Sequence, residues 1–95
     1  MLNLNAEFFE SLVGHTLTID GSRGAEAWRI ESVTRREAHR ARADAPFNVY
    51  LTAPGNNDRK QGMRSARLAN GEQIDFFAVP VASSKDGVSY EVIFN

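Results

Sequence analysis

The strongest concentration of charge in the chain is a basic segment at residues 35–42, which holds four arginines and one glutamate. Guanidinium groups can bind phosphates, and each neutralised phosphate adds affinity by releasing counterions. The arginines of this candidate basic patch are Arg35, Arg36, Arg40 and Arg42. No aromatic residues are interleaved to stack on bases, and the net charge of the chain is only −1. We therefore expect a solvated loop that is exposed, mobile and dispensable for folding, and keep a nucleic-acid-binding β-barrel as the alternative function.

The side chains that could bind a metal ion or act as a nucleophile are sparse. His15 and His39 lie far apart, neither has a second ligand at helical spacing, and the chain has no cysteine. A metal site needs several convergent ligands. The serines lie outside any nucleophile-elbow motif, and no helix follows Gly21 and Gly24 to form a phosphate-binding loop. We expect no metal, no cofactor, no small-molecule substrate and no enzymatic activity, and a small hydrolase is the least favoured function.

Two carboxylates, Asp75 and Glu91, fall on an apolar strand face. If the last hairpin turns at residues 83–87, Glu91 lies opposite Val79. If Asn70 and Gly71 form a two-residue turn in simple register, Arg64 lies diagonal to Asp75 on the same face. Paired carboxylates could serve a hydrolase, but structural ion pairs are commoner than catalytic ones. The pattern favours a salt-linked, half-apolar sheet surface.

The length and composition limit what can position these residues. A chain of 95 residues has room for one domain spanning residues 1–95, and 42% hydrophobic with 24% charged residues is ordinary for a globular protein. Its first ten residues carry Glu7 and Glu10 and lack the basic start of a signal peptide. No stretch approaches the roughly 20 apolar residues of a membrane helix. We expect a cytoplasmic protein that does not bind membranes.

The chain begins with a predicted helix over residues 5–14. Asn5 is a suitable N-cap, because its side-chain oxygen can accept a backbone N–H of the first turn. Leu4 and Phe9 have the spacing of a hydrophobic staple, and Gly14 suits the residue that ends a helix. This helix is expected to cover one open end or face of a sheet.

After Gly14 the apolar residues repeat with a period of two, which is typical of β-strands. The pattern predicts a mainly β fold: a short N-terminal helix followed by a small antiparallel β-barrel or rolled sheet of about six strands. It slips near residues 31–32, which indicates a bulge, and Pro80 must lie at a bulge or a free edge. The expected core contains Phe8, Leu12, Leu17, Ile19, Trp28, Ile30, Val49, Leu51, Phe76, Val92 and Phe94.

The strand at residues 73–82 is apolar on both faces, whereas a small barrel has only one interior. The outer face should therefore expose an apolar patch, and such patches often mark protein-binding sites. The expected contact residues are Tyr50, Arg64, Asp75, Phe77, Val79, Val81, Glu91 and Ile93. The expected partner is another protein or a second copy of this chain, and nucleic acid is disfavoured.

Several segments resemble a known family of short bacterial proteins. They are Ala-Pro-Phe-Asn-Val-Tyr-Leu at 45–51, Gln-Gly at 61–62, Phe-Ala-Val-Pro-Val at 77–81, Tyr-Glu-Val-Ile-Phe-Asn at 90–95, and residues 4–17. Together they are similar to domain-of-unknown-function family 6916. The resemblance implies a small β domain without assigned activity or catalytic residues, and it suggests a role beside tail-fibre-like proteins. The expected function is thus a non-enzymatic protein-binding or accessory module.

Overall fold

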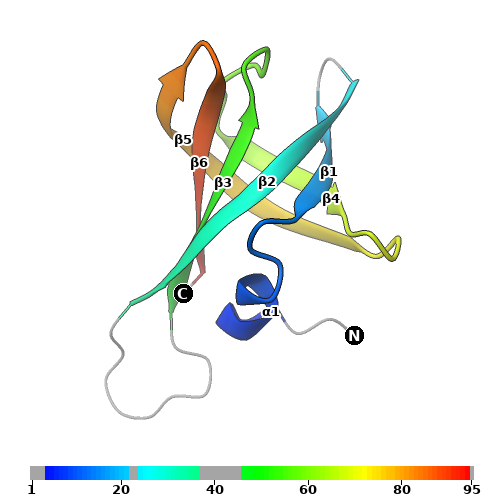
Figure 1. The fold of residues 1–95 in the computed structure, drawn as a ribbon, viewed down its shortest axis with the longest axis vertical. Coiled ribbons are helices and arrows are strands. Elements are labelled where there is room, and N and C mark those ends of the chain that lie inside the picture. Colours follow the sequence, from blue (N-terminus) through cyan, green and yellow to red (C-terminus); the bar gives the residue numbers. More distant parts are fainter. Residues whose placement is uncertain (1–3, 22–23, 37–45, 95) are drawn as a thin grey trace.

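The computed structural model describes residues 4–21, 24–36 and 46–94 as one helix and a closed antiparallel β-barrel (Figure 1). Around the barrel the strands follow the order β1-β2-β3-β6-β5-β4, and β4 returns to β1. The elements are α1 (Ala6–Glu10), β1 (Thr16–Gly21), β2 (Gly24–Arg35), β3 (Phe47–Pro54), β4 (Gly62–Arg67), β5 (Gln73–Ser84) and β6 (Gly87–Phe94). The predicted fold class is confirmed.

Helix α1 begins where the capping pattern predicts, because Asn5 Oδ1 accepts the backbone N–H of Phe8 at 2.9 Å. It ends at Glu10, earlier than expected, and the chain continues through turns to Gly14. The N–H of Gly14 donates to the carbonyl of Ile30 at 2.8 Å, with φ at 89°. This bond draws the chain into the barrel, so the positive φ of Gly14 serves the entry to β1.

The helix closes one end of the barrel with an aromatic cluster. Phe9 is buried, and its ring centroid lies 6.0 Å from that of Phe47 and 5.2 Å from that of Phe94. Phe8 and Leu12, which were expected in the core, are only partly buried against it, and so is Phe94. Phe9 lies about one helical turn after Ala6, the other buried residue of α1, so the two share the face toward the barrel.

Inside the barrel the expected alternation holds. The other predicted core residues are buried: Leu17, Ile19, Trp28, Ile30, Val49, Leu51, Phe76 and Val92. Both predicted irregularities are present as register shifts, between Ile30 and Ser32 in β2 and between Pro80 and Ala82 in β5. The second shift places Pro80 beside a bulge, where its missing N–H does not interrupt the ladder.

The hairpin between β4 and β5 differs from the prediction. Gly71 has φ of 90° but Asn70 has no positive φ, so the expected two-residue type I′ turn is wrong. Instead Leu68 and Glu72 close a three-residue loop, in which the N–H of Leu68 donates to Glu72 at 2.8 Å and the N–H of Gly71 donates to Leu68 at 2.9 Å. The extra loop residue shifts the register by one position, and a one-residue shift turns every side chain of a strand to the opposite face.

Candidate functional site

The outer surface of strands β4, β5 and β6 exposes large apolar side chains. Met63, Phe77, Val81 and Ile93 retain 66%, 48%, 52% and 50% of their accessible surface. We call these four residues, with Val79, the β5–β6 face. The predicted contact residues Phe77, Val81 and Ile93 are thus exposed, while Val79 is partly buried. Met63, which pairs with Phe77 across the β4–β5 ladder, was missed because its strand shows no apolar alternation.

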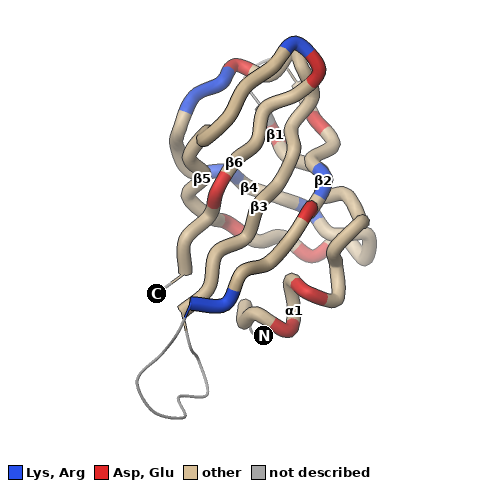
Figure 2. The backbone as a smooth tube through the Cα atoms, turned by 60° about the vertical axis from the view of Figure 1, so that its left-hand side comes forward, with Lys and Arg blue, Asp and Glu red and all other residues tan. Residues whose placement is uncertain are grey.

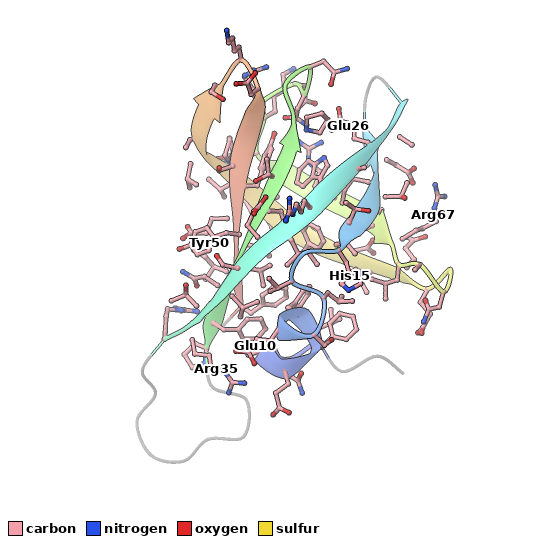
Figure 3. All side chains as sticks on the ribbon, viewed as in Figure 1. Glu10, His15, Glu26, Arg35, Tyr50 and Arg67 are labelled. Atoms are coloured by element: carbon pink, nitrogen blue, oxygen red, sulfur yellow. The ribbon has the colours of Figure 1, made fainter. Side chains whose placement is uncertain are left out.

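A polar cluster on strands β3 and β6 borders this face. Tyr50 and Glu91 are paired across the ladder, and Glu91 lies opposite Val79 as predicted. The hydroxyl of Tyr50 donates to Glu91 Oε2 at 2.7 Å, and Asn48 Nδ2 donates to the same oxygen at 3.3 Å. Figure 3 labels Tyr50 beside these strands. The cluster orients the carboxylate of Glu91 at the rim of the apolar residues.

The second predicted carboxylate, Asp75, is exposed on β5 and accepts a hydrogen bond from the Ser65 hydroxyl at 2.8 Å. Neither β5 nor β6 contains a lysine or an arginine. Arg67 on β4 lies near this end of the strand, but its guanidinium is 3.4 Å from the carboxylate of Asp20. Figure 2 shows where the basic and acidic residues fall along the backbone. The rim of the β5–β6 face therefore carries two carboxylates on strands without a basic residue.

Arg64 does not belong to this face, and that prediction is wrong. The three-residue loop pairs Arg64 with Phe76 and places Ser65 opposite Asp75, so Arg64 points into the barrel with 8% of its surface exposed. Its Nη2 donates to the carbonyl of Lys60 at 2.6 Å and lies 3.2 Å from Asp58 Oδ1.

Two aromatic rings complete the surroundings of the Arg64 guanidinium. Its Cζ lies 5.1 Å from the ring centroid of Trp28 and 5.5 Å from that of Tyr90, within the range of cation–π attraction. The two rings stack with centroids 4.3 Å apart. A buried guanidinium is stabilised here by a carboxylate, a carbonyl and two aromatic faces.

The same network fastens the loop at residues 55–61 over the end of the barrel opposite α1. The Tyr90 hydroxyl donates to Asn57 Oδ1, and Asn57 Nδ2 donates to Glu26 Oε1 at 2.7 Å. Trp28 Nε1 donates to the same Glu26 oxygen at 2.9 Å. Burial raises the pKa of the Tyr90 hydroxyl, and the nearby Arg64 opposes this only in part. Tyr90 therefore stays protonated and acts as a hydrogen-bond donor, which is a structural role.

The first two arginines of the candidate basic patch contact the fold instead of lying in a fully exposed loop, because Arg35 is the last residue of β2 and Arg36 is only partly exposed. Arg35 is exposed as predicted, and its Nε and Nη2 donate to the two carboxylate oxygens of Glu10 at 2.9 and 2.7 Å (Figure 3). Arg36 Nη2 donates to the carbonyl of Phe94 at 2.6 Å. Arg40 and Arg42 lie outside the described residues.

The Arg35 bonds lower the pKa of the Glu10 carboxyl, because they stabilise its charged form. Across the described ranges, no three His, Asp or Glu side chains gather in a way that could hold a metal ion. Within those ranges, too, no helix has the length and apolar character needed to cross a membrane.

These observations define the class of this protein as a small closed antiparallel barrel with a helix-capped end and one exposed apolar face. The chain belongs to the family described as Domain of unknown function (DUF6916), whose sequence profile matches residues 4–94, and the resemblance found in the sequence is thereby confirmed. Searches of curated proteins and of solved structures found no match.

Proposed function

We propose that this protein is a non-enzymatic binding module that docks a partner protein on the β5–β6 face. The observation that carries the proposal is the grouping of Met63, Phe77, Val81 and Ile93, each about half exposed or more, on neighbouring strands. Contiguous apolar surface rimmed by polar groups marks interaction sites more often than it occurs by chance. None of these side chains belongs to the buried core, so a partner could bury them on binding.

The charges at the rim indicate which partner fits. Asp75 and Glu91 border the apolar residues on strands that carry no lysine or arginine. A partner with an apolar centre flanked by lysine or arginine would complement this arrangement. A second copy would bring the same two carboxylates to the contact, so a separate protein is favoured over self-association. A tail-fibre-like protein, which the family resemblance suggests, is the first partner to test.

Site-specific photocrosslinking tests this proposal. A benzoylphenylalanine in place of Met63 should crosslink one protein in cells of the source organism, and the same substitution at Ala27, exposed on β2, serves as the matched control. The crosslinked protein is then purified and mixed with the wild type and with a Phe77→Ser, Ile93→Ser double variant.

Binding by the wild type, with at least about tenfold weaker binding by a folded double variant, would support the proposal, since burying such side chains contributes about 1 kcal/mol or more each. Equal crosslinking from residues 63 and 27, or equal binding by the double variant, would overturn it. A crosslink to a second copy, matched by dimers in light scattering, would replace it with self-association.

A further inference from the structure

Strand β5 divides its length between two neighbours. Residues Gln73–Ala78 pair with β4, whereas residues Val79–Ser84 pair with β6. The β5–β6 ladder stops at the pair Val79 and Glu91, although β6 itself continues to Phe94 alongside β3. Figure 1 shows the two strands diverging beyond this point, as β6 runs to the C-terminus and β5 crosses toward the β4 hairpin.

The direction of the backbone groups in the first half of β5 follows from its hairpin. Leu68 and Glu72 form a hydrogen-bonded pair. Hydrogen-bonded and non-hydrogen-bonded pairs alternate along an antiparallel ladder. Ile74, Phe76 and Ala78 therefore bond to β4, and Gln73, Asp75 and Phe77 turn their N–H and C=O groups to the other side. Within the described part of the chain, no strand pairs with that side of residues 73–78.

Among the described strands, this half of β5 has an unpaired edge next to the apolar face, where the closed barrel opens between β5 and β6. Natural edge strands are usually blocked by lysine, proline or a bulge, because their unpaired backbone groups can template another strand. Here Pro80 and the bulge fall in the half that already pairs with β6, and the free half carries none of the three, its one charged side chain being Asp75. Its outward side chains include Phe77 and Asp75, both exposed, and Ile93 of β6 is exposed across the divergence.

We propose that an extended segment of the partner adds to β5 as a further strand, bonding to the backbone of Gln73, Asp75 and Phe77. The proposal rests on the proposed function and names its mode of recognition. The segment would carry apolar residues at alternate positions, which pack on Phe77 and Ile93, and a lysine or arginine near Asp75. The main-chain bonds would supply affinity, and the two flanking side-chain groups would supply selectivity. The like charges of two Asp75 side chains disfavour pairing between identical edges.

Amide hydrogen exchange followed by NMR tests the edge and its occupant together. The probe is the acetylated and amidated peptide Lys-Val-Thr-Val-Thr-Val-Lys, with a version carrying glutamate in place of lysine as the charge control. In the free protein the amides of Asp75 and Phe77 should exchange faster than those of Phe76 and Ala78. The lysine peptide should slow exchange at Asp75 and Phe77 by about tenfold or more at saturation. The glutamate peptide should bind several-fold more weakly.

A matched pair of variants separates the backbone contact from the side-chain contact. Asp75→Ala and Asp75→Pro both remove the carboxylate, but only proline removes the N–H that faces the free edge. Asp75→Pro should bind the peptide about fivefold to tenfold more weakly than Asp75→Ala, which corresponds to one lost hydrogen bond.

If the proline variant does not fold, N-methylated peptides replace this comparison. In an added strand, alternate N–H groups of the peptide face β5. Methylation of the N–H groups that face β5 should abolish binding, and methylation of those that face away should preserve it. Three results would overturn strand addition. They are slow exchange of the Asp75 and Phe77 amides in the free protein, equal binding of the peptide by the two variants, and no binding at millimolar peptide. The crosslinking result at Met63 would then still decide the proposed function.

Discussion

The two ends of the barrel are closed by different chemistry. At one end, Phe9 of α1 packs against the rings of Phe47 and Phe94. At the other, the loop at residues 55–61 is held by hydrogen bonds and an ion pair centred on Arg64. Apolar packing has little directional preference and tolerates small shifts, whereas a buried polar network loses stability when one of its partners is removed. The aromatic end should therefore respond to lost volume, and the polar end to a single lost partner or to pH.

The largest expected effect is at the aromatic end. Phe9→Ala should lower the free energy of unfolding by about 3–4 kcal/mol, because it removes a buried ring and leaves a cavity. Phe8→Ala is the matched control and should cost about half as much, since Phe8 is only partly buried. Urea unfolding measures both. Similar values for the two variants would show that α1 does not seal the barrel as described.

At the polar end, Arg64→Met should cost about 2–3 kcal/mol, because it leaves Asp58 and the Lys60 carbonyl without their shared donor. Arg67→Met, on the same strand but exposed, should cost less than about 1 kcal/mol. Chemical denaturation of both variants checks the contrast. A neutral Arg64→Met substitution would mean that the network does not hold the loop.

The polar end should also lose stability in alkali. The Tyr90 pKa is raised above its ordinary value of 10.0, so the folded state holds this proton more tightly than the unfolded state does. The resulting stability is present below pH 10 and is lost as the pH rises through the folded pKa. In melting temperatures measured from pH 8 to above 11, Tyr90→Phe should show a shallower alkaline decline than the wild type. Parallel curves would contradict a role for Tyr90 ionisation.

The smallest effect is expected where α1 meets β2. The Glu10 pKa is lowered by Arg35 below its ordinary value of 4.5. The folded state therefore favours the charged form, and this stability is present above pH 4.5 and is lost as the pH falls through the folded pKa. Glu10→Gln should lower the melting temperature slightly at pH 7, and the difference from the wild type should vanish in acid. A difference that stays constant with pH would point to packing instead of charge.

Much of the fold could be predicted from short sequence patterns, because a helix cap or an apolar alternation of period two each favours one local structure. Asn5 indicates the start of a helix, because its side chain can cap the first turn. Trp28 and Ile30 lie two positions apart on a strand and therefore share one buried face. The outer apolar face followed from the same logic, since Phe77 alternates with the buried Phe76 on a strand that has only one interior. Met63 could not be found in this way, because its exposure depends on the register of the β4–β5 hairpin.

What only the tertiary structure decided is the face on which Arg64 and Met63 lie. The Asn70-Gly71 pair is compatible with a two-residue or a three-residue loop, and the two registers exchange the inward and outward positions of β4. Hydrophobicity alone would bury Met63 and expose Arg64, yet the structure does the reverse. Arg64 can be buried because Trp28 and Tyr90, which are distant in sequence, and the nearby Asp58 converge on its guanidinium. The sequence determined the strands and their alternation. The register of β4 against β5 was decided by the tertiary contacts that stabilise the buried Arg64 guanidinium.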